Sequence, residues 1–331
     1  MARIAINGFG RIGRAVMRIA YQNPNVEVAA INDIALPIDQ AAYILQYDSV
    51  YRRFPGEVSY NDKGLVIDGQ SIPMLAEKDP AALPWKDMGI DVVIESTGVF
   101  RTKEAASGHI TAGAKNVIIS APAKGGDVPT VVYGVNDDTI DPERDRVISG
   151  ASCTTNCLAP IAYILQKEFG IEKGWMTTVH AYTADQSIVD MAHKNWTRGR
   201  NAAQNIVPTS TGAATAVGLV LPELQGKLDG IALRVPTPTG SVVDLNAVMH
   251  QSVTVEDINN AFQKYAQGNM QKILGTSEWP LVSSDCVGDP RSSIVDLGST
   301  KVMDGNFVKV LSYYDNEWGY SNRLVDLAAK M

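Results

Sequence analysis

The sequence predicts an α/β domain with a parallel sheet, followed by an α+β domain with a mixed or antiparallel sheet. Three observations lead to this prediction. The chain has 331 residues, enough for two domains at roughly 150 residues each. Strand-like and helix-like segments alternate up to residue 150, as in parallel βαβ units. Longer strand-like runs with fewer intervening helices follow, at 175–182, 230–235 and 241–250.

The first βαβ unit is the clearest element. Residues 3–7 are a short apolar run, and from Arg11 apolar residues recur at three- and four-residue steps, which is helical spacing. Pro24 ends that helix, and residues 26–31 form a second apolar run. Strand, glycine turn, helix and strand in about thirty residues indicate two parallel strands.

The later elements continue both patterns. Strands are expected at 91–96, 117–120, 131–133 and 147–149. Helices are expected at 103–112, 151–169 and 318–331. The predicted domains are therefore 1–150 together with the C-terminal helix 318–331, and 151–317.

Composition excludes several classes of protein. The net charge of −7 argues against a nucleic-acid or acidic-membrane partner. No apolar run approaches the ~20 residues that span a bilayer, and the N-terminus lacks the pattern of a signal peptide. Three cysteines are too few for a disulfide framework, so we expect a cytoplasmic protein. A small anionic substrate would need a local group of Arg or Lys residues.

The glycine turn after the first strand fits a dinucleotide-binding fingerprint. Gly8, Gly10 and Gly13 have the G-x-G-x-x-G spacing, and they open a helix. Asp33 ends the next strand 20 positions after Gly13, where a carboxylate binds the adenosine ribose. Such a carboxylate favours NAD because it repels a 2′-phosphate. The first domain is thus predicted to be a Rossmann dinucleotide-binding domain.

Two other places could contribute to this cofactor site. Thr97 and Gly98 end a predicted strand, and ligands lie at the carboxyl ends of parallel strands. Lys78 is a possible adenine-side or phosphate contact, although a solvated surface lysine is the simpler interpretation.

Cys153 is the candidate nucleophile. It lies near the start of the long predicted helix, where the helix dipole stabilises a thiolate and free N–H groups hold an oxyanion. The alternative is a small buried cysteine, but its polar neighbours favour the nucleophile. Cys157 lies one helical turn further on, without a histidine cluster or a second cysteine pair, so no metal site is predicted. Cys157 and Cys286 are interpreted as structural.

A nucleophilic thiol needs a base or an ion-pair partner. His180 is the candidate, because it ends a strand-like run and precedes the polar stretch 181–185. His109 lies on the predicted helix 103–112 and is interpreted as a solvated helix residue. The other two histidines, His193 and His250, have no supporting pattern.

Anion-binding groups are the remaining candidates. Residues 208–212 offer hydroxyl and N–H groups just before an Ala-rich helix, which suits a phosphate or, alternatively, a plain helix cap. Arg234 interrupts an apolar strand, where a charge rarely lacks a partner. Arg198 could also supply fixed charge, whereas Arg200 is interpreted as a surface residue.

At these motifs the chain closely resembles the glyceraldehyde-3-phosphate dehydrogenase family. The matching segments occur in order from end to end, at 6–14, 152–156, 208–212, 234–238 and 314–320. The resemblance implies a nucleophile, Cys153, and a residue that activates it, His180. It implies that the attacking inorganic phosphate is held by Ser152, Thr154, Thr211 and Gly212. It implies that the substrate's own phosphate is held by Thr183, Arg198 and Arg234. The dinucleotide contacts would be Arg11, Ile12, Asp33, Lys78, Ser120 and Asn316.

The resemblance also implies the reaction and the assembly. Members oxidise glyceraldehyde 3-phosphate to 1,3-bisphosphoglycerate in glycolysis through a cysteine hemithioacetal and a thioester that inorganic phosphate attacks. They are cytoplasmic homotetramers in which a loop at about 183–205 packs against a neighbouring subunit's cofactor site. No nucleic-acid or membrane partner is expected.

Departures from the family pattern leave alternatives open. Many NAD-preferring members have a Leu-Pro pair where this chain has Met191-Ala192, so NADP is possible beside NAD. Ser187 and Thr197 replace arginines that are frequent in bacterial members. The alternative functions are an erythrose-4-phosphate dehydrogenase, whose thioester is hydrolysed by water, and a catalytically silent dinucleotide-binding protein. The silent alternative predicts a defective nucleophile–base pair, whereas Cys153 and His180 are both present.

Overall fold

The computed structural model describes all residues, 1–331, and the chain divides into two compact units. The first unit comprises 1–131, 139–152 and 321–331, and the second comprises 132–138 and 153–320. Residues 132–138 and 318–320, which were predicted in the first domain, therefore belong to the second unit, and residues 151–152 belong to the first. The chain contains no helix with the length and apolarity that crossing a membrane requires.

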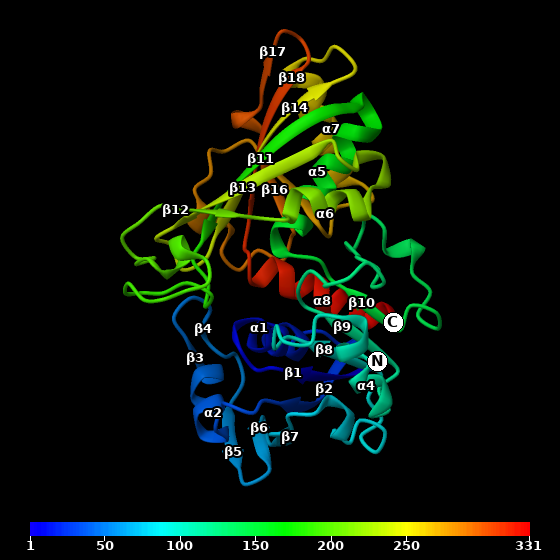
Figure 1. The fold of residues 1–331 in the computed structure, drawn as a ribbon, viewed down its shortest axis with the longest axis vertical. Helices are drawn as coiled ribbons and strands as arrows, with labels where there is room; N and C mark the ends of the chain where they lie inside the picture. The colour runs from blue at the N-terminus through cyan, green and yellow to red at the C-terminus, as the bar shows by residue number, and fades with distance from the viewer. The chain divides into compact units, whose positions relative to one another are not determined.

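The first unit is built on an eight-stranded sheet, and it confirms the predicted α/β class (Figure 1). Its spatial order is β10 (Val147–Ser149), β9 (Asn116–Ile119), β8 (Val92–Glu95), β1 (Ala2–Asn7), β2 (Val26–Asn32), β7 (Gln70–Leu75), β6 (Gly64–Ile67) and β5 (Val58–Asn61). The first six strands are parallel, and β7, β6 and β5 form an antiparallel meander. The carboxyl ends of the parallel strands lie at one edge of the sheet, so the segments that follow these strands lie together there.

Helices connect these strands. They are α1 (Arg11–Tyr21), α2 (Ile38–Gln46), α3 (Lys103–Ala106) and α4 (Gly108–Thr111), and a hairpin of β3 (Tyr47–Asp48) and β4 (Arg52–Arg53) follows α2. The meander, α2 and the hairpin were not predicted. The single helix predicted at 103–112 is two short helices, because Ser107 ends one and precedes the other. Its hydroxyl donates to the carbonyl of Lys103 at 2.7 Å, a side-chain bond that competes with helix continuation.

The strand predicted at 131–133 is wrong. The N–H of Val132 bonds at 2.8 Å to the side-chain oxygen of Asn136, so it is not available to a sheet. Gly134 has a φ of 78° and turns the chain directly afterwards. Only Thr130, next to this segment, forms an isolated bridge, with Ser149. A local turn therefore takes the backbone groups of Val132, while the N–H of Val131 still bonds to the carbonyl of Ser149 at 2.8 Å.

The second unit contains the predicted mixed sheet. Its order is β12 (Val207–Ser210), β13 (Leu228–Val235), β11 (Ile171–Ala181), β14 (Ser241–Met249), β18 (Phe307–Tyr314), β16 (Ser293–Asp296) and β15 (Leu274–Ser277), with β17 (Lys301–Met303) paired to β18. The β11–β13 and β15–β16 pairs are parallel and the others are antiparallel. The prediction of an α+β domain with a mixed sheet is confirmed.

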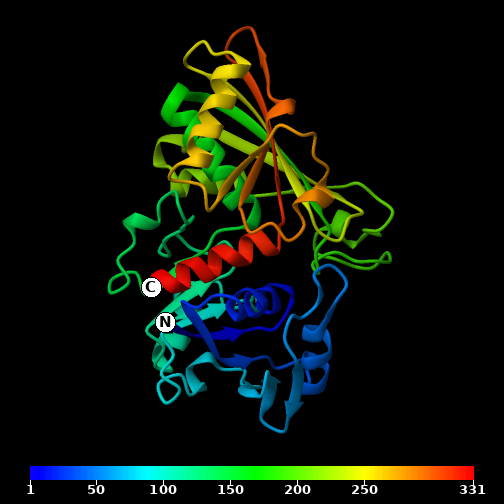
Figure 2. The ribbon, with the colours of Figure 1, turned by 180° about the vertical axis from the view of Figure 1, so that it is seen from behind.

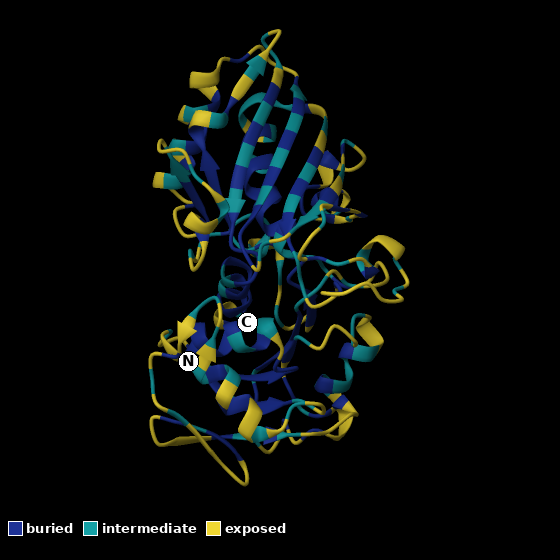
Figure 3. Ribbon diagram, turned by 90° about the vertical axis from the view of Figure 1, so that its left-hand side faces the viewer, coloured by how far each residue is buried: buried dark blue, intermediate teal, exposed yellow.

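Three helices cover one face of this sheet, as the view from behind shows (Figure 2). They are α5 (Cys153–Phe169), α6 (Ala213–Val220) and α7 (Val255–Gln267). The other face carries no helix, and its strands alternate between buried and partly exposed residues (Figure 3). The chain ends in α8 (Trp318–Lys330), the predicted terminal helix. Short 3₁₀ turns lie at Pro80–Ala82, Asp137–Thr139, Trp196–Gly199, Pro222–Leu224, Ser283–Cys286 and Leu297–Ser299.

Candidate active site

The glycine turn after β1 has the geometry that close approach of a dinucleotide requires. Gly8 has a φ of 95°, and a Cβ there would lie 2.7 Å from the backbone nitrogen of Thr97. A Cβ on Gly13 would collide with the carbonyl oxygen of Gly8, whereas a Cβ on Gly10 would meet no atom within 4 Å. The first and third glycines thus permit tight packing, and the second faces open space at the start of α1. A pyrophosphate fits this space, where free N–H groups and the helix dipole favour an anion.

Backbone N–H groups hold both carboxylate oxygens of Asp33, which directly follows β2. Phe9 donates to Oδ2 at 2.8 Å, and Ala35 and Leu36 donate to Oδ1 at 2.9 and 3.1 Å. A hollow of about 400 Å³ lies beside this carboxylate, lined by residues 33–38 and 74–76. A carboxylate fixed in this way suits the predicted bond to ribose hydroxyls.

The other predicted cofactor contacts in the first unit lie along the same edge of the sheet. Thr97 and Gly98 follow β8, and Ser120 follows β9. Arg11 and Ile12 begin α1, and Lys78 is an exposed residue shortly after β7. The Arg11 guanidinium pairs with Asp48 and lies 5.5 Å from the centre of the Tyr51 ring.

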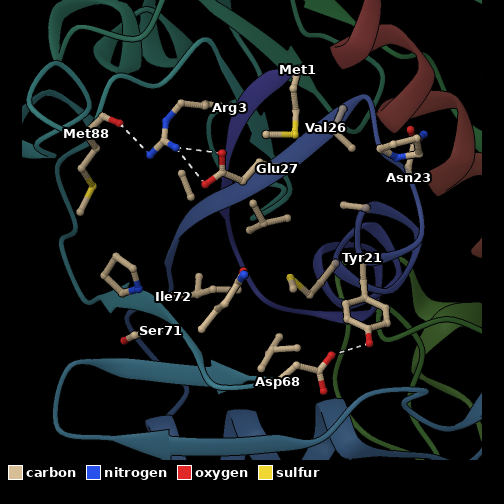
Figure 4. A pocket seen from close by; sticks show the side chains of 18 of the residues that line it. Met1, Arg3, Tyr21, Asn23, Val26, Glu27, Asp68, Ser71, Ile72 and Met88 are labelled. Carbon is tan, nitrogen blue, oxygen red and sulfur yellow. Dashed lines mark hydrogen bonds and ion pairs between the residues drawn. The ribbon is translucent and has the colours of Figure 1, made fainter.

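A larger hollow, of about 1030 Å³, lies at the opposite edge, where β1, β2 and β7 begin. Figure 4 shows that some of its polar side chains bind one another. Arg3 pairs with Glu27 at 2.8 Å, and the Tyr21 hydroxyl donates to Asp68 at 2.5 Å. None of the predicted site residues lines this hollow, so it is not the candidate site.

Cys153 is the first residue of α5 and is partly exposed. The chain reaches it through a sharp turn, in which Ala151 has a φ of 59°. A non-glycine residue in this left-handed region costs on the order of 1–3 kcal/mol and is frequent near functional sites. As the sequence predicted, the thiol therefore lies where the helix dipole acts on it.

The register of the second sheet brings His180 beside Arg234. The parallel strands β11 and β13 pair these two residues directly. His180 is buried, and its Nε2 lies 3.4 Å from the Sγ of Cys153. Cys153, His180 and Arg234, three of the predicted residues, therefore meet at the end of one strand pair and the start of one helix.

The bonds around Nδ1 of His180 define two alternative tautomers. Nδ1 lies 2.7 Å from the carbonyl oxygen of Ala181 and 2.8 Å from an Arg234 nitrogen, which also donates to that carbonyl at 2.9 Å. A guanidinium only donates, so it bonds to Nδ1 only when this nitrogen carries no proton. When Nδ1 is protonated, it donates to Ala181 instead, and the lone pair of Nε2 then faces Cys153. Arg234 keeps its bond to the carbonyl in both cases.

Burial sets the protonation of this pair. Burial lowers the pKa of His180 to about 3, and the positive charges of Arg234 and Arg198 add to this effect. Burial raises the pKa of the Cys153 thiol, opposed by the charge of Arg234 and by hydrogen bonds to Thr154. The resting pair is consequently a neutral thiol beside a neutral imidazole, which is able to accept a proton.

Apart from Ser152, the predicted phosphate contacts lie in the second unit, in two groups. Arg234 has a buried Nε without a hydrogen-bond partner, a donor that an anion would satisfy. Arg198 donates from Nε to Thr209 at 2.9 Å and pairs with Asp185. Thr183 donates its backbone N–H to Gln186 at 3.3 Å.

The start of α6 carries the second group. The hydroxyl of Thr211 accepts from the N–H of Ala213 at 3.2 Å, and Gly212 is the residue that precedes the helix. Gly212 is the N-cap residue and the helix has no side-chain cap, so the plain helix cap is not found here. Thr155 of α5 donates to the carbonyl of Ala213 at 3.4 Å, so the first turns of α5 and α6 are neighbours. Ser152 directly precedes Cys153 in the chain.

Asn316 has a fixed amide. Its side-chain oxygen accepts from the backbone of Gly240 at 3.2 Å and from the hydroxyls of Ser241 and Thr239 at 3.0 and 3.3 Å. The oxygen is thus committed to the protein, which leaves the NH₂ group as the part of the amide that can donate to a ligand.

Tyr314 is a residue that the sequence analysis did not assign to the site. Its buried hydroxyl lies 2.9 Å from Thr154 and 3.0 Å from Thr178, and its ring meets His180 edge-on at 6.0 Å. Tyr314 therefore orients Thr154 and supports one side of the imidazole.

The two remaining cysteines are buried, as expected of structural residues. Burial raises the pKa of both Cys157 and Cys286 to about 12. Both thiols are therefore poor nucleophiles at neutral pH. His109, in contrast, is not the solvated helix residue that was predicted, because it is fully buried against Trp85 and Glu95.

A parallel sheet with a glycine turn at its carboxyl edge, joined to a unit that pairs a cysteine with a histidine, defines a nicotinamide-dependent oxidoreductase. Comparisons with known proteins specify it further. Residues 2–103 match the NAD binding domain of glyceraldehyde 3-phosphate dehydrogenase, and residues 152–316 match its C-terminal domain. The chain belongs to the glyceraldehyde-3-phosphate dehydrogenase family.

Curated relatives agree with this assignment over nearly the whole chain. A glyceraldehyde-3-phosphate dehydrogenase of Priestia megaterium is 56% identical over 326 residues, which cover 98% of this chain and 97% of the relative. Glyceraldehyde-3-phosphate dehydrogenase 1 of Bacillus subtilis and the enzyme of Geobacillus stearothermophilus are each 56% identical over 327 residues. These residues cover 99% of this chain and 97% of each relative. NAD is the cofactor that the matched domain binds.

Proposed function

We propose that this chain catalyses the phosphorylating oxidation of D-glyceraldehyde 3-phosphate to 1,3-bisphosphoglycerate with NAD, the glycolytic reaction of its family. The observation that carries the proposal is the 3.4 Å approach of the Cys153 sulfur to His180 Nε2 beside Arg234. The printed names of the relatives support the same activity.

Cys153 opens the reaction by forming a bond to the aldehyde carbon. The thiol is protonated at rest because burial raises its pKa, so it loses its proton to His180 as it attacks. His180 accepts that proton on Nε2 in the tautomer whose Nδ1–H is donated to Ala181. His180 then gives that proton to the former carbonyl oxygen, which leaves His180 neutral again and a hemithioacetal on Cys153.

Oxidation converts the hemithioacetal into a thioester. Bound NAD would supply the hydride acceptor that this oxidation needs. His180 removes the hydroxyl proton at the same time, because its low pKa keeps it neutral and available. Inorganic phosphate finally attacks the thioester carbon, the C–S bond breaks, and Cys153 leaves as a thiolate that is protonated again.

Two anion-binding sites hold the two phosphates of the reaction, that of the substrate and inorganic phosphate. Arg234, Arg198 and Thr183 hold the phosphate of the substrate, and the buried Nε of Arg234 supports this assignment because it has no partner in the protein. Ser152, Thr154, Thr211 and Gly212 hold inorganic phosphate, supported by the adjacent first turns of α5 and α6. Helix starts favour anions.

The adenosine and pyrophosphate side of the cofactor is held by residues of the glycine turn, the start of α1 and the position after β2, namely Gly8, Gly10, Arg11, Ile12, Gly13 and Asp33. Thr97, Gly98, Ser120 and Lys78 lie along the same edge, and Asn316 offers its NH₂ group to the nicotinamide amide. The anchored carboxylate of Asp33 favours NAD over NADP. The substitution of Met191-Ala192 for Leu-Pro allows some use of NADP.

The two functional domains follow the division of the motifs along the chain. Residues 1–150 with helix 318–331 are proposed as the dinucleotide-binding domain and 151–317 as the catalytic domain, with 132–138 and 318–320 packed in the second compact unit. The matches at 2–103 and 152–316 support this division.

A homotetramer in the cytoplasm is the proposed state of the protein. The segment 183–206 exposes large apolar side chains, each more than half exposed, at Ile188, Val189, Met191, Trp196 and Ile206. The uncovered face of the second sheet exposes Trp175, Ile231 and Phe307. Contiguous exposed apolar patches mark interaction sites, and second copies of the chain are the occupants that the family resemblance implies. Free cysteines suit a reducing compartment.

The assembly is tested by light scattering on a sizing column. Wild-type protein is expected at four times the chain mass. Trp175→Glu on the sheet face is expected to lower that mass, whereas Tyr60→Glu, at an exposed site of the first unit, is expected to leave it unchanged. A wild-type protein that runs as a monomer would exclude the tetramer.

The activity is tested by NADH formation from glyceraldehyde 3-phosphate and NAD, with and without inorganic phosphate. Sustained turnover only with phosphate is expected. Turnover that is indifferent to phosphate would indicate thioester hydrolysis, the chemistry of an erythrose-4-phosphate dehydrogenase. NAD binding without turnover would indicate a catalytically silent protein.

A further inference from the structure

A buried polar network lies directly beneath the predicted cofactor edge of the first unit. It consists of Asn7, Asn32, Trp85, Glu95 and His109, each at most 3% exposed. Asn7, Asn32 and Glu95 are the last residues of the parallel strands β1, β2 and β8. The segments that follow them carry the glycine turn, Asp33, and Thr97–Gly98. The proposed reaction mechanism makes no use of this network.

One side of the network is oriented by the backbone. The N–H of Glu77 donates to the side-chain oxygen of Asn32 at 2.8 Å, and the NH₂ of Asn32 donates to the carbonyl of Glu77 at 2.9 Å. The amide of Asn32 can therefore have only one orientation. Its NH₂ also donates to the side-chain oxygen of Asn7 at 2.7 Å, which directs the NH₂ of Asn7 to Oε2 of Glu95 at 2.5 Å.

The other side is oriented by an indole. Trp85 Nε1 bonds to Nδ1 of His109 at 3.0 Å, and because an indole N–H only donates, Nδ1 must be the acceptor. His109 is then a neutral imidazole with its proton on Nε2. That nitrogen lies 3.1 Å from Oε2 of Glu95, so it donates there.

Glu95 is the point where these bonds converge. Its Oε2 accepts from Asn7 and His109, and its Oε1 accepts from the backbone N–H of Thr97 at 2.9 Å and from the Thr97 hydroxyl. Three of the four groups around it are N–H groups that can only donate, and the fourth is the Thr97 hydroxyl, so we infer an ionised carboxylate without a cationic partner. A buried charge is costly unless it is fully hydrogen-bonded, and here three of the four bonds come from N–H groups.

The network also fixes the spacing of the cofactor segments. Thr97, held by Glu95, packs against the glycine turn so closely that a Cβ on Gly8 would lie 2.7 Å from its nitrogen. Asn7 donates to Glu95 and Asn32 donates to Asn7, so these side chains link the ends of β1, β2 and β8.

We propose that the ionised carboxylate of Glu95 is a positioning group of the cofactor site. It does not touch NAD but sets the relative positions of the glycine turn, the Asp33 segment and the Thr97–Gly98 turn. This inference rests on the proposed cofactor site. It predicts that the neutral isostere Glu95→Gln weakens NAD binding. The NH₂ group of the new amide, at either oxygen position, would face an N–H group that can only donate, so one hydrogen bond would be lost.

A second substitution is expected to restore the network. In the double variant Asn7→Asp with Glu95→Gln, the carboxylate moves to position 7. The amide oxygen introduced by Glu95→Gln accepts from Thr97, and the accompanying NH₂ group donates to the carboxylate introduced by Asn7→Asp. His109 Nε2, 3.3 Å from the present Asn7 nitrogen, donates to that carboxylate as well, and Asn32 keeps its bond to it.

The test measures the NAD dissociation constant by calorimetry, the KM for NAD and kcat of the full-length enzyme, and its thermal midpoint. Glu95→Gln is expected to raise the dissociation constant and the KM at least about tenfold, with kcat at saturating NAD within about threefold. The double variant is expected to return the dissociation constant to within about threefold of wild type. Val117→Ala, in the buried core of the same unit, lowers the thermal midpoint without changing NAD affinity.

Three results would overturn the inference. They are unchanged NAD affinity in Glu95→Gln, no recovery in the double variant, and an equal loss of affinity in Val117→Ala. If Glu95→Gln does not fold, the double variant alone decides, since it must fold and bind NAD. Failure of the wild-type protein to bind NAD would instead contradict the proposed function.

Discussion

Burial of His180 makes the stability of the protein sensitive to acid. Its pKa is lowered from 6.5 to about 3 in the folded protein, while the unfolded chain binds a proton near pH 6.5. Between these two values the unfolded state holds more protons, so stability rises with pH and is lost on acidification. At about 1.4 kcal/mol per pH unit, a fall from pH 6.5 to pH 5 costs about 2 kcal/mol. The loss continues to about 5 kcal/mol near pH 3.

Urea unfolding at pH 7.5 and pH 5 measures this effect, with His180→Asn as the variant that removes the titrating group. Acidification is expected to cost the wild-type protein about 2 kcal/mol more than the variant. His250→Asn, at an exposed position, is the matched control and is expected to retain the wild-type dependence. Equal acid sensitivity of wild type and His180→Asn would refute the reasoning, since the buried imidazole would then carry no linked proton.

Three further outcomes are expected. Cys153→Ser lowers NADH formation at least about 10³-fold while calorimetry shows unchanged NAD binding; retention of activity would remove Cys153 as the nucleophile. Asp33→Asn weakens NAD binding about tenfold, or about 1.4 kcal/mol, and raises the ratio of NADP to NAD turnover; an unchanged ratio would mean that Asp33 does not select the cofactor. Tyr314→Phe leaves the buried hydroxyls of Thr154 and Thr178 without their shared partner. The free energy of unfolding, measured by urea titration, is expected to fall by about 1–3 kcal/mol. No change would mean that other groups satisfy both hydroxyls.

The sequence predicted those parts of the fold that local patterns control. The βαβ unit at the N-terminus, the helix that begins at Cys153 and the strand that ends near His180 follow from apolar periodicity and glycine spacing. Helix α7 was missed although its signal was present. Thr254 and Asp257 form a capping box before residues at helical spacing.

Contacts between distant residues were beyond reach of the sequence. The burial of His109 depends on Trp85, which lies 24 positions away in the sequence. No local sequence pattern predicts that contact. The pairing of His180 with Arg234 depends on the register of β11 and β13, which the chemistry of single segments does not determine. The segment 131–133 was apolar enough for a strand, but the side-chain oxygen of Asn136 accepts the backbone N–H of Val132.

The same distinction applies to the candidate site. Cys153, His180 and the glycine turn were found because motif chemistry and position are readable in the chain. Tyr314, whose hydroxyl joins Thr154 to Thr178, was not found because its role arises from three separate elements.

The most direct test of the proposed mechanism is a single turnover without phosphate, followed by mass spectrometry of the protein. With glyceraldehyde 3-phosphate and NAD, we predict a burst of about one NADH per active site and a 3-phosphoglyceroyl adduct on Cys153. Added inorganic phosphate is predicted to release the adduct as the acyl phosphate. An adduct on Cys157 or Cys286, or a burst without any adduct, would contradict the mechanism.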